Sequence, residues 1–140
     1  MRMYAQSDSH TYASTNGFLS IKSGSAQYQP GTFPLSYLPN NTVAPFMDDL
    51  YLYGTGSPQD GIFYQIKAGG SGVTYEYYLE RAGDVSYPFH FTVDYDRASP
   101  GIFVFTYYST GGPNDNGIYC GVGTQGSKFT VYFHRTETYR

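Results

Sequence analysis

Hydrophobic and polar residues alternate with a period of two along most of the chain, and this period is typical of half-buried β-strands. In residues 89–95, for example, every second position is aromatic or aliphatic and the positions between them are polar. Apolar residues fill both faces in 102–108, which predicts a central strand covered on both sides. The predicted strands are 17–22, 43–53, 61–67, 73–79, 89–95, 102–108, 117–122 and 128–134.

Turn residues separate these strands. Segments rich in Gly, Pro, Asn, Asp or Ser lie at 54–61, 68–72, 96–101 and 111–117. The long connection 23–41 contains three prolines, and we expect it to cross from one sheet to another. Short strands joined by such turns predict a single antiparallel β-sandwich, jelly-roll-like and of about eight strands, that takes up residues 1–140 as one domain.

Composition agrees with an all-β domain and narrows the partners. The 140 residues include 17 Tyr and 10 Phe but no Trp, and tyrosine favours both strands and contact surfaces. With a net charge of −3 and only 8 Lys plus Arg, the chain has no basic stripe for a nucleic-acid backbone. No apolar run approaches the roughly 18 residues of a membrane span. We therefore expect neither nucleic acid nor a membrane span.

The expected location is secreted or at the extracellular surface. Low charge with many Thr, Ser and Tyr residues favours it, although no apolar signal core follows the first residues. The alternatives are an intracellular protein or a part of a longer secreted one. The single Cys120 cannot form an internal disulfide, and its uncharged surroundings predict a buried, unreactive thiol.

Two adjacent carboxylates, Asp48 and Asp49, lie within the otherwise apolar and aromatic run 43–53. On a strand, neighbouring side chains point to opposite faces, so that only one of the two points inward. Three interpretations stay open. The inward Asp is a hydrogen-bond anchor; the pair is a cation site, with calcium as the ion and Asp60 and Asp115 as further oxygen ligands; or one Asp serves in a catalytic carboxylate pair.

Five tyrosines fall where alternation leaves some of them on an outer face: Tyr51, Tyr53, Tyr78, Tyr108 and Tyr132. Exposed aromatic clusters mark binding sites for sugars, peptides or other subunits. Outer tyrosines also stabilise cross-strand pairs, and both interpretations stay open. His90 and His134 are expected on polar faces of their strands, and no Gly-x-Ser-x-Gly or His-Glu-x-x-His pattern occurs. The chain therefore offers no catalytic constellation of a familiar kind.

Four segments together resemble the nidogen-type extracellular domain. They are Thr15-Asn16-Gly17-Phe18-Leu19-Ser20-Ile21, Pro34-Leu35, Val43-Ala44-Pro45-Phe46-Met47-Asp48-Asp49-Leu50 and Gly61-Ile62-Phe63-Tyr64. The similarity covers about residues 12–127, and Met47 stands where that family usually has Trp. The resemblance implies a β-rich extracellular module for adhesion or assembly, without catalysis, and it makes both aspartates positions of the family motif.

Three functions follow as hypotheses. The leading one is a non-enzymatic extracellular module that acts through Tyr-rich surfaces, with an extracellular protein, a glycan or further copies of itself as partner. The second is a lectin-like carbohydrate-binding module, assisted by calcium. The third is a small glycosidase that pairs Asp48 or Asp49 with Glu76 or Glu80.

Overall fold

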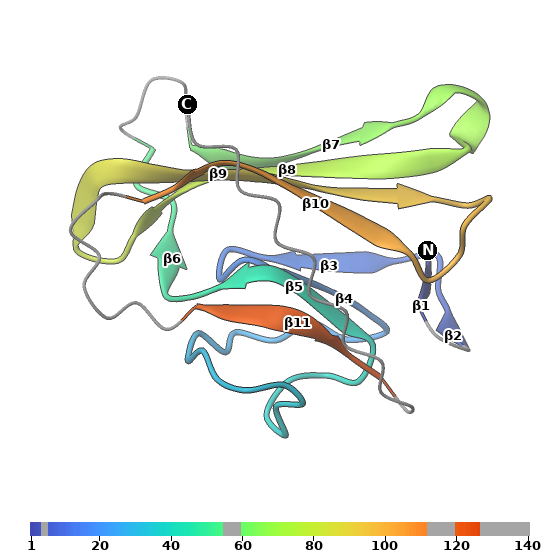
Figure 1. Ribbon diagram of the computed structural model, residues 1–140, viewed down its shortest axis with the longest axis horizontal. Coiled ribbons are helices and arrows are strands. Elements are labelled where there is room, and N and C mark those ends of the chain that lie inside the picture. The colour runs from blue at the N-terminus through green and yellow to red at the C-terminus, as the bar shows by residue number, and fades with distance from the viewer. Residues whose placement is uncertain (4–5, 55–59, 112–119, 127–140) are drawn as a thin grey trace.

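Two packed antiparallel sheets form the protein in a computed structural model, which describes residues 1–3, 6–54, 60–111 and 120–126 (Figure 1). A five-stranded sheet lies over a four-stranded one, and a two-stranded hairpin lies at one end. The predicted fold class, an all-β antiparallel sandwich, is confirmed. No helix in the described part of the chain has the length and apolar character needed to cross a bilayer.

The four-stranded sheet has the order β11-β5-β4-β3 and the five-stranded sheet the order β10-β9-β8, with β6 and β7 both pairing with β8. The first consists of β3 (Thr11–Ser14), β4 (Phe18–Ile21), β5 (Thr42–Met47) and β11 (Gly121–Gln125). The second consists of β6 (Leu50–Tyr51), β7 (Gly61–Ile66), β8 (Gly72–Arg81), β9 (Asp84–Asp96) and β10 (Phe103–Thr110). The hairpin is β1 (Arg2–Met3) with β2 (Gln6–Ser7), and a short 3-10 turn (Ala68–Gly70) joins β7 to β8.

Most predicted strands are present with boundaries shifted by a few residues. The predicted strand 128–134 and the first residues of 117–122 lie outside the described part of the chain. The expectation that 102–108 is covered on both sides is wrong. Val104 and Tyr108 are 56% and 62% exposed, because the outer face of β10 has no second layer over it among the described residues.

The core lies between the two sheets, and two tyrosines join the sheets by hydrogen bonds. The Tyr77 hydroxyl on β8 donates to the carbonyl of Phe18 on β4 at 3.0 Å, and Tyr77 is fully buried. The Tyr107 hydroxyl on β10 donates to the carbonyl of Pro45 on β5 at 2.5 Å. A buried hydroxyl needs such a partner, so these two residues satisfy their own polar groups while they cross-link the layers.

The proline-rich connection does not cross between sheets, contrary to the expectation. It leaves β4 and returns to β5, the neighbouring strand of the same sheet, with Leu19 opposite Val43. Three prolines and a long span are compatible with either route, and only strand pairing decides between them. The connection instead covers the outer side of this sheet, where Leu35 and Leu38 are buried with Phe18 and Met47 in a second apolar cluster.

Gln125 on β11 holds this connection in place with three hydrogen bonds. Its Oε1 accepts the backbone N–H of Leu35 at 2.8 Å, and its Nε2 donates to the carbonyls of Leu38 at 2.9 Å and Pro39 at 2.8 Å. Gln125 is only 3% exposed. The loop backbone therefore has its buried polar groups satisfied by a single side chain that is distant in sequence.

The chain changes sheets at Asp48 and Asp49, which form a bend between β5 and β6. The prediction that both stand on one continuous strand is wrong, since the extended run 43–53 is broken at this corner. The carbonyl of Asp49 accepts the N–H of Ala82 at 3.0 Å, beyond the end of β8. The two adjacent carboxylates thus mark a corner of the sandwich.

Gly17, within the Asn-Gly part of the nidogen-like segment, is required at the start of β4. Its φ is +75°, and a Cβ there would stand 1.8 Å from the carbonyl oxygen of Phe46. The Gly17 carbonyl accepts the N–H of Phe46 at 3.3 Å. Two of the segments that carry the resemblance are therefore in direct backbone contact.

Candidate functional site

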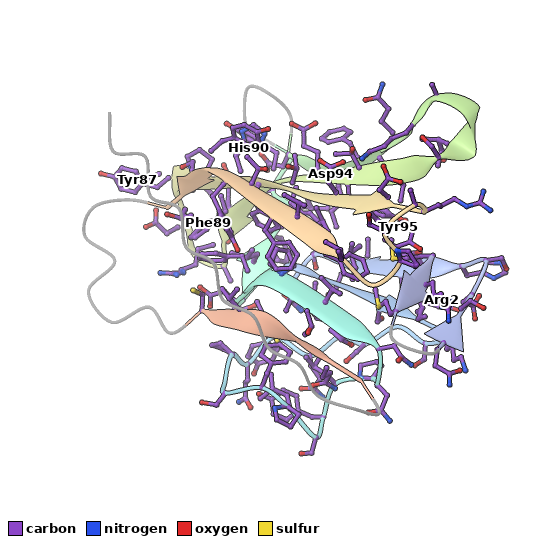
Figure 2. All side chains as sticks on the ribbon, turned by 45° about the vertical axis from the view of Figure 1, so that its right-hand side comes forward. Arg2, Tyr87, Phe89, His90, Asp94 and Tyr95 are labelled. Atoms are coloured by element: carbon purple, nitrogen blue, oxygen red, sulfur yellow. The ribbon has the colours of Figure 1, made fainter. Side chains whose placement is uncertain are left out.

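The outer face of the five-stranded sheet carries the residues that alternate with the core positions. They are Phe63 and Gln65 on β7, Thr74, Glu76 and Tyr78 on β8, His90, Thr92 and Asp94 on β9, and Val104, Thr106 and Tyr108 on β10. Figure 2 shows His90 and Asp94 on this face, while Phe89 and Tyr95 are directed toward the core. The face therefore combines aromatic and polar side chains over four neighbouring strands.

Four aromatic side chains lie on these four neighbouring strands, and we call Phe63, Tyr78, His90 and Tyr108 the aromatic row. The ring of Phe63 lies over Gly61, where a Cβ would come within 2.4 Å of it, and Gly61 is opposite Tyr78 in the strand register. Tyr78 is opposite His90, with their ring centroids 5.3 Å apart. His90 stacks on Tyr108 at 4.5 Å with an interplanar angle of 29°.

Local irregularities and hydrogen bonds set the orientation of the row. The register between β9 and β10 shifts between Tyr107 and Ser109, and such a bulge turns the extra residue, Tyr108, toward His90. His90 Nε2 lies 2.8 Å from a carboxylate oxygen of Glu76. This contact fixes the imidazole between two tyrosine rings, so the aromatic row is held in place before any partner binds.

The other end of the outer face is polar. Asp94 receives hydrogen bonds from the Thr74 hydroxyl and from Lys67 Nζ, both at 2.8 Å. Burial favours the neutral carboxyl, but the contacts with Lys67 and Thr74 outweigh it and lower the pKa of Asp94. A charged, hydrogen-bonded group therefore stands beside the aromatic row on the same face.

The predicted tyrosine set is divided by the structure. Tyr78 and Tyr108 belong to the aromatic row, whereas Tyr51 and Tyr53 form a separate pair with ring centroids 4.8 Å apart. Tyr51 is 54% exposed and is opposite Glu80 of β8, so this pair borders the same sheet. Tyr132 lies outside the described residues.

Sequence reasoning did not place Phe63 in this set, and it assigned His90 to a solvated surface. Alternation does place both side chains on the outer face of the sheet. The side chains that they contact, however, depend on strand order and on the bulge at Tyr108. Neither of these can be predicted from the alternation of apolar and polar residues.

Asp48 is engaged in contacts that hold the corner. Its Oδ2 pairs with the Arg81 guanidinium at 2.6 Å, and its Oδ1 accepts the backbone N–H of Asp49 at 2.8 Å. The side chain of Asp49 is exposed. This geometry is that of a hydrogen-bond and ion-pair anchor, one of the three interpretations of the pair. The described residues contain no group of three or more His, Cys, Asp or Glu that could hold a metal ion.

A second carboxyl pair, Asp60 with Glu80, is buried beside the tyrosine pair. Asp60 Oδ2 accepts the backbone N–H groups of Tyr53 at 3.1 Å and Gly54 at 3.0 Å. Burial raises the pKa of Glu80, and the neighbouring carboxyl group of Asp60 adds to this effect. The sequence shows only that Glu80 lies on a strand and Asp60 in a turn, so their contact depends on the fold.

A cleft of about 670 Å³ opens between the N-terminal hairpin and the adjoining ends of β8 and β9. Its lining includes Arg2 and Arg97 together with Asp8 and the aromatic residues Tyr75 and Tyr95. Because the lining contains both basic and acidic side chains, it favours neither an anionic nor a cationic ligand.

Comparison with models of known protein families, with curated proteins and with solved structures found no match. The nidogen-type resemblance therefore stays a prediction, and the argument for function depends on the outer face itself.

Proposed function

We propose that the protein is a non-enzymatic extracellular module for adhesion or assembly, and that it binds through the aromatic row. The observation that supports the proposal most directly is the presence of four aromatic rings on four neighbouring strands, of which Tyr78, His90 and Tyr108 contact one another in succession. Phe63 and Tyr108 are 49% and 62% exposed. Exposed apolar groups gathered in this way mark contact surfaces rather than ordinary solvent-facing sheet.

The row has the physical properties of an interface centre. A covered aromatic side chain contributes about 150–250 Å² of contact area, and its two side-chain torsions carry little entropy to lose. His90 is already stacked and bonded to Glu76, which lowers the ordering cost of binding. A stable interface needs about 800 Å² from each partner, so the polar groups around the row would form its rim.

The absence of a familiar catalytic pattern in the sequence supports the non-enzymatic part of the proposal. In the structure, Asp48 is paired with Arg81 and Glu76 with His90, so these two carboxylates of the glycosidase hypothesis make separate contacts. A retaining glycosidase needs two carboxyl groups about 5–5.5 Å apart across one sugar bond. These contacts favour the structural roles.

Glycan binding is the second candidate, and the mixed chemistry of the face favours it. Sugar rings stack on aromatic side chains through their C–H faces, and their hydroxyl groups need hydrogen-bond partners at the edge. His90 belongs to the aromatic row and contacts Glu76, and Asp94 lies further along the same face. This candidate uses the same surface as the first and differs only in the chemistry of the partner.

A double variant, Phe63→Ser with Tyr108→Ser, tests the surface because both side chains are exposed and their loss leaves the core intact. Self-association is measured by sedimentation velocity over a concentration series, and sugar binding on an array of immobilised oligosaccharides. We expect the double variant to weaken whichever interaction the native protein shows by about 10- to 100-fold, as for the loss of interface hot spots.

The matched control is Tyr12→Ser with Tyr28→Ser, which also removes two aromatic side chains that are 43% and 48% exposed. Both lie in the part of the chain that forms or follows the four-stranded sheet, away from the aromatic row. We expect this control to bind like the native protein. A native protein that stays monomeric at all concentrations and binds no oligosaccharide would contradict the proposal.

A further inference from the structure

We propose that Asp60 and Glu80 form a calcium-binding site at the edge of the five-stranded sheet, distinct from the surface of the aromatic row. The site joins three segments of the fold. Asp60 directly precedes β7, Glu80 lies near the end of β8, and the backbone of Tyr53 and Gly54 after β6 contacts Asp60.

Buried oxygen atoms without a partner carry the inference. Asp60 and Glu80 are 8% and 5% exposed, yet Asp60 Oδ1 and Glu80 Oε2 have no hydrogen-bond partner. Among the described residues, only one other buried side-chain oxygen or nitrogen atom, Asn41 Oδ1, lacks a hydrogen-bond partner. Buried polar atoms are almost always paired, so two neighbouring unpaired carboxyl oxygens indicate a missing group.

The electrostatics of the pair require that its negative charge be compensated. Two backbone N–H groups hold Asp60 Oδ2 and favour the ionised carboxylate, while Glu80 brings a second acidic group within hydrogen-bonding reach. The ion pairs of the described residues link basic side chains to other carboxylates; Arg81, for example, pairs with Asp48. Two buried carboxyl groups in contact need either a shared proton or a cation between them.

The donor set favours calcium over other cations. Carboxylate oxygens are hard ligands, and two of them from a loop and a strand leave the remaining positions to backbone carbonyls and water. Ca²⁺ accepts such irregular coordination by 6–8 oxygen atoms, whereas Mg²⁺ demands near-ideal octahedral geometry. A bound Ca²⁺ would neutralise both carboxylates and join the Tyr51–Gly54 segment to β8.

Calcium titration of the native protein and three variants tests the site. Glu80→Gln is the principal variant, because its amide can donate to Asp60 Oδ1 and complete the pair without a cation. Asp60→Asn is the second. Asp84→Asn is the matched control, since it removes one negative charge from an exposed carboxylate at the start of β9.

Stability is measured by thermal unfolding in EDTA and in about 5 mM CaCl₂, with MgCl₂ as a second probe, and binding by calorimetry. For a Kd of about 0.1–1 mM, we expect calcium to raise Tm of the native protein by about 3–8 °C. The Asp84→Asn control should show the same shift. Glu80→Gln and Asp60→Asn should show none, and calorimetry of the native protein should give one site.

Two results would overturn the proposal. Native protein with neither a calcium-dependent Tm shift nor a calorimetric signal would mean that the pair holds a proton instead. An equal shift in Glu80→Gln and the native protein would place the ion elsewhere. Calorimetry on the native protein keeps the test decisive if either variant fails to fold.

Discussion

Replacing Gln125 with Leu should destabilise the protein strongly, although the two side chains have similar volume. Leu fills the same space but cannot bond the Leu35 N–H or the carbonyls of Leu38 and Pro39, which Gln125 contacts at 2.8, 2.9 and 2.8 Å. A typical hydrogen bond contributes about 1 kcal/mol net, and a buried group left unpaired costs about 1–3 kcal/mol. For three bonds we expect a loss of about 3–5 kcal/mol, a large share of a usual total of about 5–15 kcal/mol.

Urea denaturation monitored by circular dichroism measures this loss. We expect a lower midpoint with an unchanged slope, because the core stays the same size. The control is Gln65→Leu on the exposed outer face of β7, which should change stability by no more than about 0.5 kcal/mol. A loss below about 1 kcal/mol for Gln125→Leu would refute the argument that this side chain satisfies the connection.

Three further changes test other contacts. Tyr77→Phe removes the donor to the Phe18 carbonyl and should cost about 1–2 kcal/mol in guanidinium unfolding; an unchanged midpoint would mean that this sheet-to-sheet bond adds nothing. The pKa of Glu80 is raised from 4.5, so in calcium-free buffer stability should fall as pH rises above that value; Glu80→Gln should remove this pH dependence, and an identical pH profile in both proteins would contradict it. A double-mutant cycle of Asp48→Asn and Arg81→Met should give a coupling of about 1–2 kcal/mol for the half-buried pair, and near-zero coupling would exclude an anchoring role.

Strand positions could be predicted from the sequence because alternation reflects a local property, the two faces of an extended chain. The run 89–95 is an example, since its buried residues Phe89, Phe91 and Val93 are those that the period of two selects. Alternation contains no information on which strands are neighbours. Alternation therefore predicts the sandwich, but it does not show that the connection 23–41 returns to the sheet it leaves, from β4 to β5.

The two carboxyl pairs show that sites, too, cannot be predicted from the sequence pattern when they depend on which strands are neighbours. Asp48 and Asp49 are adjacent, so the sequence alone marks them as a pair, yet the corner between the sheets gives their side chains different surroundings. Asp60 and Glu80 are distant in sequence, and they meet because β6 and β7 both pair with β8. A contact that depends on strand order cannot be derived from spacing along the chain.

The routing of the chain also has a consequence for the order of folding. Strands β7 to β10 follow one another as hairpins, so these four strands of the five-stranded sheet close only short loops. The four-stranded sheet must bring β11 to β5, and the Gln125 contacts span 86 to 90 residues. We expect the sheet with the aromatic row to form early and the Gln125 contacts to form after the rate-limiting step, so that Gln125→Leu accelerates unfolding and leaves the folding rate almost unchanged.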